Sequence, residues 1–298
     1  MTAPGGALER RYRRLLLAYP RTYRRAHGDE LLDVLLEEAG PGRRFPVLRE
    51  AWGLLAGGLR SRVTHQATGS AWVDGLHLGV TAVAVVNLAA LLPYAHRLPL
   101  WTLVSALALL AILRGWTRTA FALTLLTGVK AVGLAAGRQA FDVAVLPVPP
   151  NPLSGRALFQ DSDPLPVAAG YAITLIGLAL LAWPRRPVRA RSWWWWAAVV
   201  PVAWAGPAWL PEDTRYLISL SRMAVEAAAF GLVVAAGHLT RDHRWSLASG
   251  IYLLALSCEL AWHAEHLGRQ HLAYAGILGL LFLAAAFAPL RQRRHCLD

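Results

Sequence analysis

Residues 73–94 read VDGLHLGVTAVAVVNLAALLPY, and Asp74 and His77 carry the only acidic or basic side chains in this stretch. As an α-helix with a rise of 1.5 Å per residue, the stretch would span about 33 Å. The hydrocarbon core of a bilayer is roughly 30 Å thick. The length and the composition therefore predict a transmembrane helix rather than a helix of a soluble core.

Seven more apolar stretches of similar length follow, separated by short polar connections. They lie near residues 98–113, 120–136, 165–183, 193–210, 216–236, 245–262 and 272–290. Tryptophan, which prefers the membrane interface, occurs at or near many of their ends, including the run Trp193 to Trp196. The sequence predicts an all-α, polytopic transmembrane bundle of about eight helices over residues 71–298.

Composition agrees with a membrane protein and argues against binding to nucleic acid. Hydrophobic residues make up 56% of the chain and charged residues 16%, against about 25% charged in an average soluble domain. Much of the net charge of +12 is placed in the first seventy residues and in alternate short connections, without interleaved aromatic residues. The two cysteines, Cys258 and Cys296, form neither a disulfide framework nor a zinc pattern.

The first seventy residues are predicted to form a separate, small domain of three helices. Expected helices cover residues 7–18, 22–39 and 46–63, with breaks at Tyr19-Pro20 and Pro41-Gly42. The earliest apolar run, 15–18, is four residues long and flanked by arginines, so we expect no secretory signal peptide. Leu48, Trp52, Leu55 and Leu59 recur at helical spacing in the third helix. A core of this size is marginal, so we expect the domain to dock onto a membrane surface or a partner.

The distribution of arginine predicts the orientation. With the amino terminus inside, the inner connections and tail hold eleven arginines and the outer ones five. The inner set is Arg114, Arg118, Arg185, Arg186, Arg189, Arg191, Arg241, Arg244, Arg291, Arg293 and Arg294; the outer set is Arg97, Arg138, Arg156, Arg215 and Arg269. Positive charge is retained on the cytoplasmic side. We therefore expect a plasma-membrane protein with both termini in the cytoplasm.

Ionisable and strongly polar residues within predicted spans are candidates for function, because placing them in hydrocarbon is costly. Arg222 and Glu226 are four residues apart, so they share a helix face and can pair. Lys130 and Glu259 have no partner along their own helices, and a contact between them across helices is considered. Asn87 can hydrogen-bond between helices. These five residues are expected to serve as structural pairs or as an ion or proton pathway.

Glu259, His263 and His266 form the strongest candidate for a metal site. Offsets of four and seven would place them on one stripe of a helix, and their side chains are suitable ligands for zinc. His271 would be a possible fourth ligand from the next helix. The spacing differs from the His-Glu-x-x-His pattern of zinc proteases, and interfacial polar residues are the preferred interpretation.

Motifs for other chemistry are not found. The glycine-rich residues 53–58 lack the Gly-Lys-Ser/Thr ending of a phosphate-binding loop, and there is no Gly-x-Ser-x-Gly elbow. Ser219 and Ser221 lie near Arg222, which raises the alternative of an intramembrane serine hydrolase, but serines at such positions more often bond to their own helix backbone. We predict no enzymatic activity and no cofactor, with a membrane metalloenzyme as a remote alternative.

Residues 9–38, ERRYRRLLLAYPRTYRRAHGDELLDVLLEE, resemble the helical prefix domain of many actinobacterial multi-pass membrane proteins. That prefix consists of an arginine-leucine helix, a Tyr-Pro break, a Tyr-Arg-Arg helix and a Gly-(Asp/Glu)-Glu-Leu turn. It is called a HAAS-type signalling domain in some proteins and a permease prefix in others. The resemblance implies a cytoplasmic regulatory or interaction module, without catalytic residues. The large outer domain of macrolide-exporter permeases has no counterpart between the first two spans.

Two functions follow as hypotheses. The first is a regulatory, signalling or scaffold membrane protein whose residues 1–64 bind a cytoplasmic protein partner. The alternative is a transporter or channel that uses Lys130, Arg222, Glu226 and Glu259. The ligand, the partner and the oligomeric state are not encoded in any pattern that we recognise.

Overall fold

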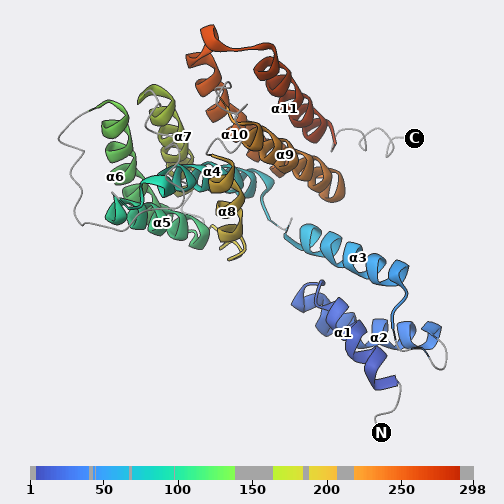
Figure 1. Cartoon of the computed structure of the whole chain (residues 1–298). Coiled ribbons are helices and arrows are strands. Elements are labelled where there is room, and N and C mark those ends of the chain that lie inside the picture. Colours follow the sequence, from blue (N-terminus) through green and yellow to red (C-terminus); the bar gives the residue numbers. More distant parts are fainter. Residues whose placement is uncertain are drawn as a thin grey trace. The chain divides into compact units, whose positions relative to one another are not determined.

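The computed structural model describes residues 5–39, 43, 45–66, 69–96, 98–137, 164–183, 188–206 and 218–288. Arg97, Arg138, Arg156, Arg215, the arginines at 185–186 and 291–294, and Cys296 lie outside the described residues. Every regular element within them is a helix, as predicted. The chain divides into two compact units, residues 1–69 and 70–298 (Figure 1).

In the first unit, the part of the chain that the structure describes forms three helices, α1 (Gly5–Leu16), α2 (Arg21–Ala39) and α3 (Leu48–Gln66). Its core is a single apolar cluster formed by Leu8, Tyr12, Leu16, Leu32, Ala39 and Leu54. α1 supplies half of this core because its apolar residues follow one another at helical spacing between arginines. Proline at position 20 follows α1, where it prevents the helix from continuing.

α3 packs against the rest of the unit through a face that contains Leu54, Gly57 and Gly58. A Cβ atom at Gly58 would lie 2.6 Å from the Cβ of Ala18, and one at Gly57 would lie 2.5 Å from the hydroxyl of Tyr19. Arg62 donates hydrogen bonds from Nε and one terminal nitrogen to the carbonyl oxygens of Ala18 and Leu17. The apolar stripe of α3 consequently faces away from the core of the unit.

The described residues of the second unit form eight apolar helices. They are α4 (Ala71–Leu91, continued by η1, Leu92–Tyr94), α5 (Pro99–Arg114), α6 (Thr117–Ala135), α7 (Pro164–Ala182), α8 (Trp195–Ala205), α9 (Leu220–Thr240), α10 (Arg244–Trp262) and α11 (Arg269–Phe287). Six of them are long and apolar enough to cross a membrane: α4 with η1, α6, α7, α9, α10 and α11. The multi-pass character of the chain is thus compatible with the structure, with six rather than eight full-length candidate spans.

The two shorter helices coincide with the second and fifth predicted spans. α5 has 16 residues and α8 has 11, so α8 would extend over only about 16 Å. α8 contains Pro201 and ends at Ala205, directly before Gly206-Pro207. Residues 207–210 of the predicted fifth span lie outside the described residues.

α4 is the central helix of the second unit. It contacts α5, α7, α8 and α10 (Figure 1). Of its most apolar stretch of 18 residues 78% is buried, against 17–33% of the corresponding stretches in the other candidate spans. α4 and α10 approach each other closely: a Cβ atom at Gly75 would lie 2.8 Å from the carbonyl oxygen of Arg244. Small residues allow such close contact between apolar helices.

Helices α9, α10 and α11 lie side by side and share an apolar cluster (Figure 1). Its buried residues are Ile218, Phe230, Leu256, Tyr274 and Leu278. α10 therefore connects α4 with α9 and α11, because it packs on α4 and also on α9 and α11.

Candidate functional site

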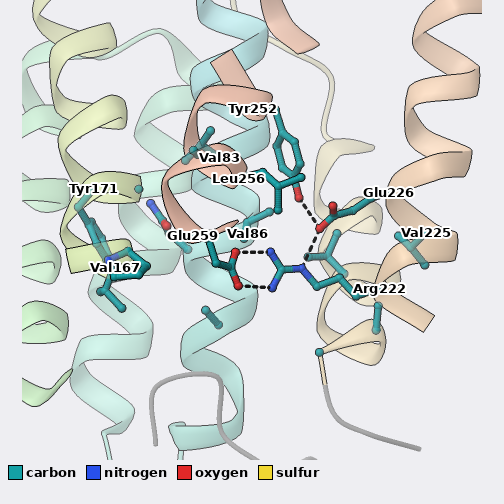
Figure 2. Close-up of a pocket in the computed structure, with 18 residues that line it drawn as sticks. Val83, Val86, Val167, Tyr171, Arg222, Val225, Glu226, Tyr252, Leu256 and Glu259 are labelled. Atoms are coloured by element: carbon teal, nitrogen blue, oxygen red, sulfur yellow. Dashed lines mark hydrogen bonds and ion pairs between the residues drawn. The ribbon is translucent and has the colours of Figure 1, made fainter. Parts of the chain in front are cut away.

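A buried ion cluster connects α9 with α10. Arg222 donates through both terminal nitrogens to the carboxylate of Glu259, at 3.0 and 2.7 Å, and through Nε to Oε1 of Glu226 at 2.8 Å. The guanidinium lies between the two carboxylates (Figure 2). The predicted pairing of Arg222 with Glu226 is confirmed, and the structure adds Glu259, which the sequence left without a partner.

Two tyrosines complete the environment of Glu226. The hydroxyl of Tyr252, from α10, donates to Oε1 at 2.8 Å, and the hydroxyl of Tyr274, from α11, donates to Oε2. Each hydrogen bond around the two carboxylates has the carboxylate as acceptor, which is the pattern of ionised groups. Three helices thus converge on one acidic side chain.

The local sequence explains why Arg222 stands at this position. Ser219 is the N-cap of α9, and its side chain accepts a hydrogen bond from the backbone N–H of Arg222 at 3.2 Å. The hydroxyls of Ser219 and Ser221 both donate to the carbonyl oxygen of Ala205 at the end of α8. These serines fix helix ends, so the contacts favour a structural role over the hydrolase alternative.

A cavity of about 140 Å³ lies beside the ion cluster. Its walls come from α4, α7, α8, α9 and α10 (Figure 2). Most of the lining is apolar, as at Val83, Val86, Val167, Val225 and Leu256. The polar part consists of Asn87, Tyr171, Arg222, Glu226, Tyr252 and Glu259. A largely apolar cavity with a few convergent polar groups is the usual form of a small-molecule site.

Asn87 and Lys130, two polar residues of the predicted spans, lie in different parts of the second unit. Asn87 lines this cavity and donates from Nδ2 to Oγ1 of Thr174 on α7 at 3.4 Å, which is the predicted bond between helices. Lys130 is buried in α6, with its ammonium nitrogen 5.6 Å from the ring centroid of Trp101 on α5. The carboxylate of Glu259 binds Arg222 rather than Lys130.

The predicted metal stripe does not form a continuous helical face. α10 ends at Trp262, His263 is its C-cap, and His266 belongs to the short 3₁₀ turn η4 (Ala264–His266). Nδ1 of His263 lies 3.0 Å from the carbonyl oxygen of Glu259, and Nδ1 of His271 accepts from the backbone of Gly268. Among the described residues, no group of three or more His, Cys, Asp and Glu side chains is placed to hold a metal ion.

A second ion cluster was missed by the sequence reasoning. Asp74, in the first turn of α4, pairs with Arg191 at 2.9 Å and with Arg244 at 2.7 Å. Arg244 also pairs with Asp242 at 2.6 Å. The sequence held two signals for this cluster. Asp74 is the only acid of the first predicted span, and Arg191 and Arg244 are assigned to the inner side, where that span begins. These arginines entered the prediction only as evidence for topology.

This second cluster gathers segments that are distant in sequence at one end of the unit. The backbone N–H of Arg191, shortly before α8, also donates to the carbonyl oxygen of Leu113 at 2.7 Å. The start of α4, the end of α5 and the start of α10 therefore meet there. The chain leaves this end of the unit along α4 and returns to it along α5. The 16-residue helix α5 therefore runs antiparallel to α4.

The first unit offers a candidate surface of a different kind, the apolar stripe of α3. Leu48, Trp52, Leu55 and Leu59 are 86, 72, 36 and 61% exposed. They lie on one helix face because their offsets are four, seven and eleven residues. The sequence predicted the helical spacing of these four residues, and the structure places their side chains on the exposed side of α3. Large exposed apolar stripes generally mark interaction sites.

Comparison with protein-family models, with curated proteins and with solved structures finds no match to this chain. Three regions of the described residues bear on function: the cluster of Arg222, Glu226 and Glu259 with its cavity, the cluster around Asp74, and the stripe of α3.

Proposed function

We propose that this chain is a multi-pass plasma-membrane protein of regulatory, signalling or scaffold type, without enzymatic activity. Eight helices enter the bilayer, both termini are cytoplasmic, and residues 1–64 bind a cytoplasmic protein partner. The single observation that carries the proposal is the exposed apolar stripe of α3, in a unit that otherwise has its own core.

The arrangement of the second unit supports the topology in this proposal. Arg191 and Arg244, which the arginine count assigns to the inner side, lie at the same end as the start of α4. The contact of residue 191 with Leu113 brings the end of α5 to that end as well. Successive helices that alternate in direction, with an even total, leave both termini on one side.

A protein partner accounts for the stripe better than a lipid surface does. Four large side chains in one line match the groove-binding pattern of amphipathic helices. The unit carries both signs of charge, a pattern that a protein surface can complement. Besides its arginines it presents five exposed acids on α2: Asp29, Glu30, Asp33, Glu37 and Glu38. The resemblance of residues 9–38 to a prefix interaction module agrees with this choice.

The test is an affinity purification of the full-length protein from native membranes. Trp52→Glu with Leu59→Glu places two charges in the stripe, so we expect the cytoplasmic partner to be lost. Val34→Glu is the matched control, because Val34 is also an exposed apolar residue but belongs to α2. A variant lacking residues 1–64 should behave like the double variant.

An unchanged list of partners in the stripe variant would contradict the proposal. Lipid docking would be indicated instead by a crosslinking experiment in anionic nanodiscs. In that case the purified wild type would form more crosslinks to lipid than the stripe variant does. Because the variants lie outside the second unit, their effects do not depend on the ion clusters.

A second candidate function is transport, favoured by the cluster of Arg222, Glu226 and Glu259 beside a cavity. Charged groups inside membrane helices often mark ion or substrate pathways. This function predicts that Glu259→Gln alters a flux or its coupling to protons in proteoliposomes. Normal flux in that variant would count against it, and Lys130, which is placed over Trp101, is not required by it.

A further inference from the structure

We propose that the cavity beside Arg222 and Glu259 binds a small primary alkylammonium ion. The inference concerns binding within the second unit and goes beyond the proposed interaction of residues 1–64. Three properties of the cavity carry it: the charge of the cluster, the acceptors that face a ligand, and the apolar character of the remaining wall.

The formal charge of the cluster is the first property. Arg222 contributes one positive charge, and Glu226 and Glu259 contribute two negative charges, so these three residues sum to −1. The cluster lies near the ends of two candidate spans, in surroundings that are mostly apolar. A net negative charge is costly in such surroundings, and a monovalent cation in the adjoining cavity would balance it.

The arrangement of hydrogen bonds is the second property. Both oxygens of Glu226 are occupied by tyrosine hydroxyls, and Oε1 also accepts from Arg222. Glu259 accepts one bond per oxygen, both from Arg222, although a carboxylate offers about four acceptor positions. Its side chain is 27% exposed, against 8% for Glu226. Glu259 is therefore the carboxylate that a ligand can reach.

Asn87 supplies a second acceptor in the lining. Its amide nitrogen is engaged with Thr174, which leaves the carbonyl oxygen Oδ1 to accept from a ligand. A primary ammonium has three N–H donors, enough for Glu259 and Asn87 together. The rings of Tyr171 and Tyr252, also in the lining, suit a cation as well.

The size and the apolar wall are the third property. A volume of about 140 Å³ is close to the roughly 150 Å³ of a cavity that holds benzene. The apolar part of the lining is made mostly of valine, leucine and alanine side chains, which offer no oxygen ligands to an inorganic cation. An alkyl chain of three to five carbons would occupy that space, so the ligand class is a short alkylammonium rather than Na⁺ or K⁺.

The experiment measures binding of radiolabelled n-butylammonium to the purified full chain in nanodiscs of zwitterionic lipid. We expect saturable binding that n-butanol, of the same size but uncharged, and Na⁺ do not displace. Glu259→Gln should weaken binding about tenfold or more, the effect of losing one charge-assisted hydrogen bond. The matched control is Glu265→Gln, because Glu265 is exposed on η4 outside the cavity.

Ala255→Leu is a second variant that fills the cavity and leaves every charge in place; it should also abolish binding. Displacement by equimolar n-butanol or Na⁺, unchanged binding in Glu259→Gln, or the absence of saturable binding to the wild type would each overturn the proposal. The wild-type competition series needs no variant, so it decides the question even where a substitution prevents folding. None of these results bears on the partner of residues 1–64.

Discussion

The second unit contains two buried ion clusters that differ in charge balance and in surroundings. Asp74, Asp242, Arg191 and Arg244 form a cluster of two acids and two bases, which is neutral in sum. Arg222, Glu226 and Glu259 form a cluster with one base and two acids, beside a cavity. The neutral cluster fastens helix ends together, whereas the unbalanced cluster lies at a cavity and is suited to bind a cation.

Burial of the acidic side chains is similar in the two clusters, since Asp74 and Asp242 are 22 and 20% exposed and Glu259 is 27% exposed, so charge balance and not burial distinguishes the clusters. Arg244 is only 2% exposed, and its guanidinium bridges Asp74 and Asp242. Glu259 retains an exposed fraction of about a quarter although it forms a bidentate pair. The position of a charge in a helical membrane protein is thus less informative than whether its partners balance it.

Removing the single base of the unbalanced cluster should have the largest effect. Arg222→Met leaves Glu226 and Glu259 without their shared cation, so we expect the free energy of unfolding to fall by about 3–5 kcal/mol. Denaturation in lipid-detergent micelles would measure it, with Arg269→Met, an exposed arginine of α11, as control. A loss no greater than that of the control would show that the carboxylates are not both ionised.

The neutral cluster should be less sensitive to the loss of one base. In Arg244→Met, Asp74 keeps its pair with Arg191, so we expect a loss of about 1.5–3 kcal/mol, the value of hydrogen bonds to charged groups. The same denaturation assay applies, and Arg114→Met, at the exposed end of α5, serves as control. If this variant lost as much stability as Arg222→Met, the distinction between the two clusters would fail.

Hydroxyl donors to Glu226 should contribute less than the guanidinium. Tyr252→Phe removes one donor while Tyr274 and Arg222 remain, so we expect a loss of about 1 kcal/mol. Combination with Tyr274→Phe should cost more than the sum of the single variants, because the two hydroxyls share one carboxylate. Strict additivity in a double-mutant cycle would argue that Glu226 is satisfied by Arg222 alone.

The pair of Tyr12 and Glu50 in the first unit gives a reference outside the apolar helices, with the smallest expected effect. Tyr12 donates to Glu50 at 2.7 Å; burial, followed by this bond, raises the pKa of Tyr12 to about 12. The same bond lowers the pKa of Glu50 below its ordinary value. Stability from the raised group is complete below about pH 10 and is lost as pH rises toward 12, while that from Glu50 is lost as pH falls below about 4.5.

Proteolysis of the full chain by subtilisin between pH 8 and 11 would test this reference. Cleavage within residues 1–69 should rise with pH in the wild type. In Tyr12→Phe that pH dependence should be weaker, because the titrating hydroxyl is absent. A steeper alkaline rise in the variant would contradict the assigned role of Tyr12.

Helix positions in the second unit could be predicted well because hydrophobic length is a local property. The expected start and end of α10 agree with the structure within one residue, and those of α7 likewise. Helix ends were less predictable where capping decides them, as at Ser219, which starts α9 four residues later than expected. The pair of Arg222 with Glu226 was predictable because both residues are in one helix, four positions apart.

Contacts between helices could not be predicted in the same way. Glu259 and Asp74 each found partners on other helices, 37 and up to 170 residues away in the chain. In α3, the large apolar residues and the glycines define two faces that could pack. The glycine face is the buried one, because it allows close approach to Ala18. Which face of a helix is buried depends on the shape of its neighbour.

The sequence by itself determined that the chain is helical, that several of its helices are apolar and of membrane-spanning length, and where the polar residues stand along them. These properties follow from the local length and spacing of apolar residues. Only the tertiary structure decided that two acids and one arginine share a cavity, that a second cluster is neutral, and that the stripe of α3 is exposed. Each of these depends on distances between segments remote in sequence, which close packing of side chains sets and local patterns do not encode.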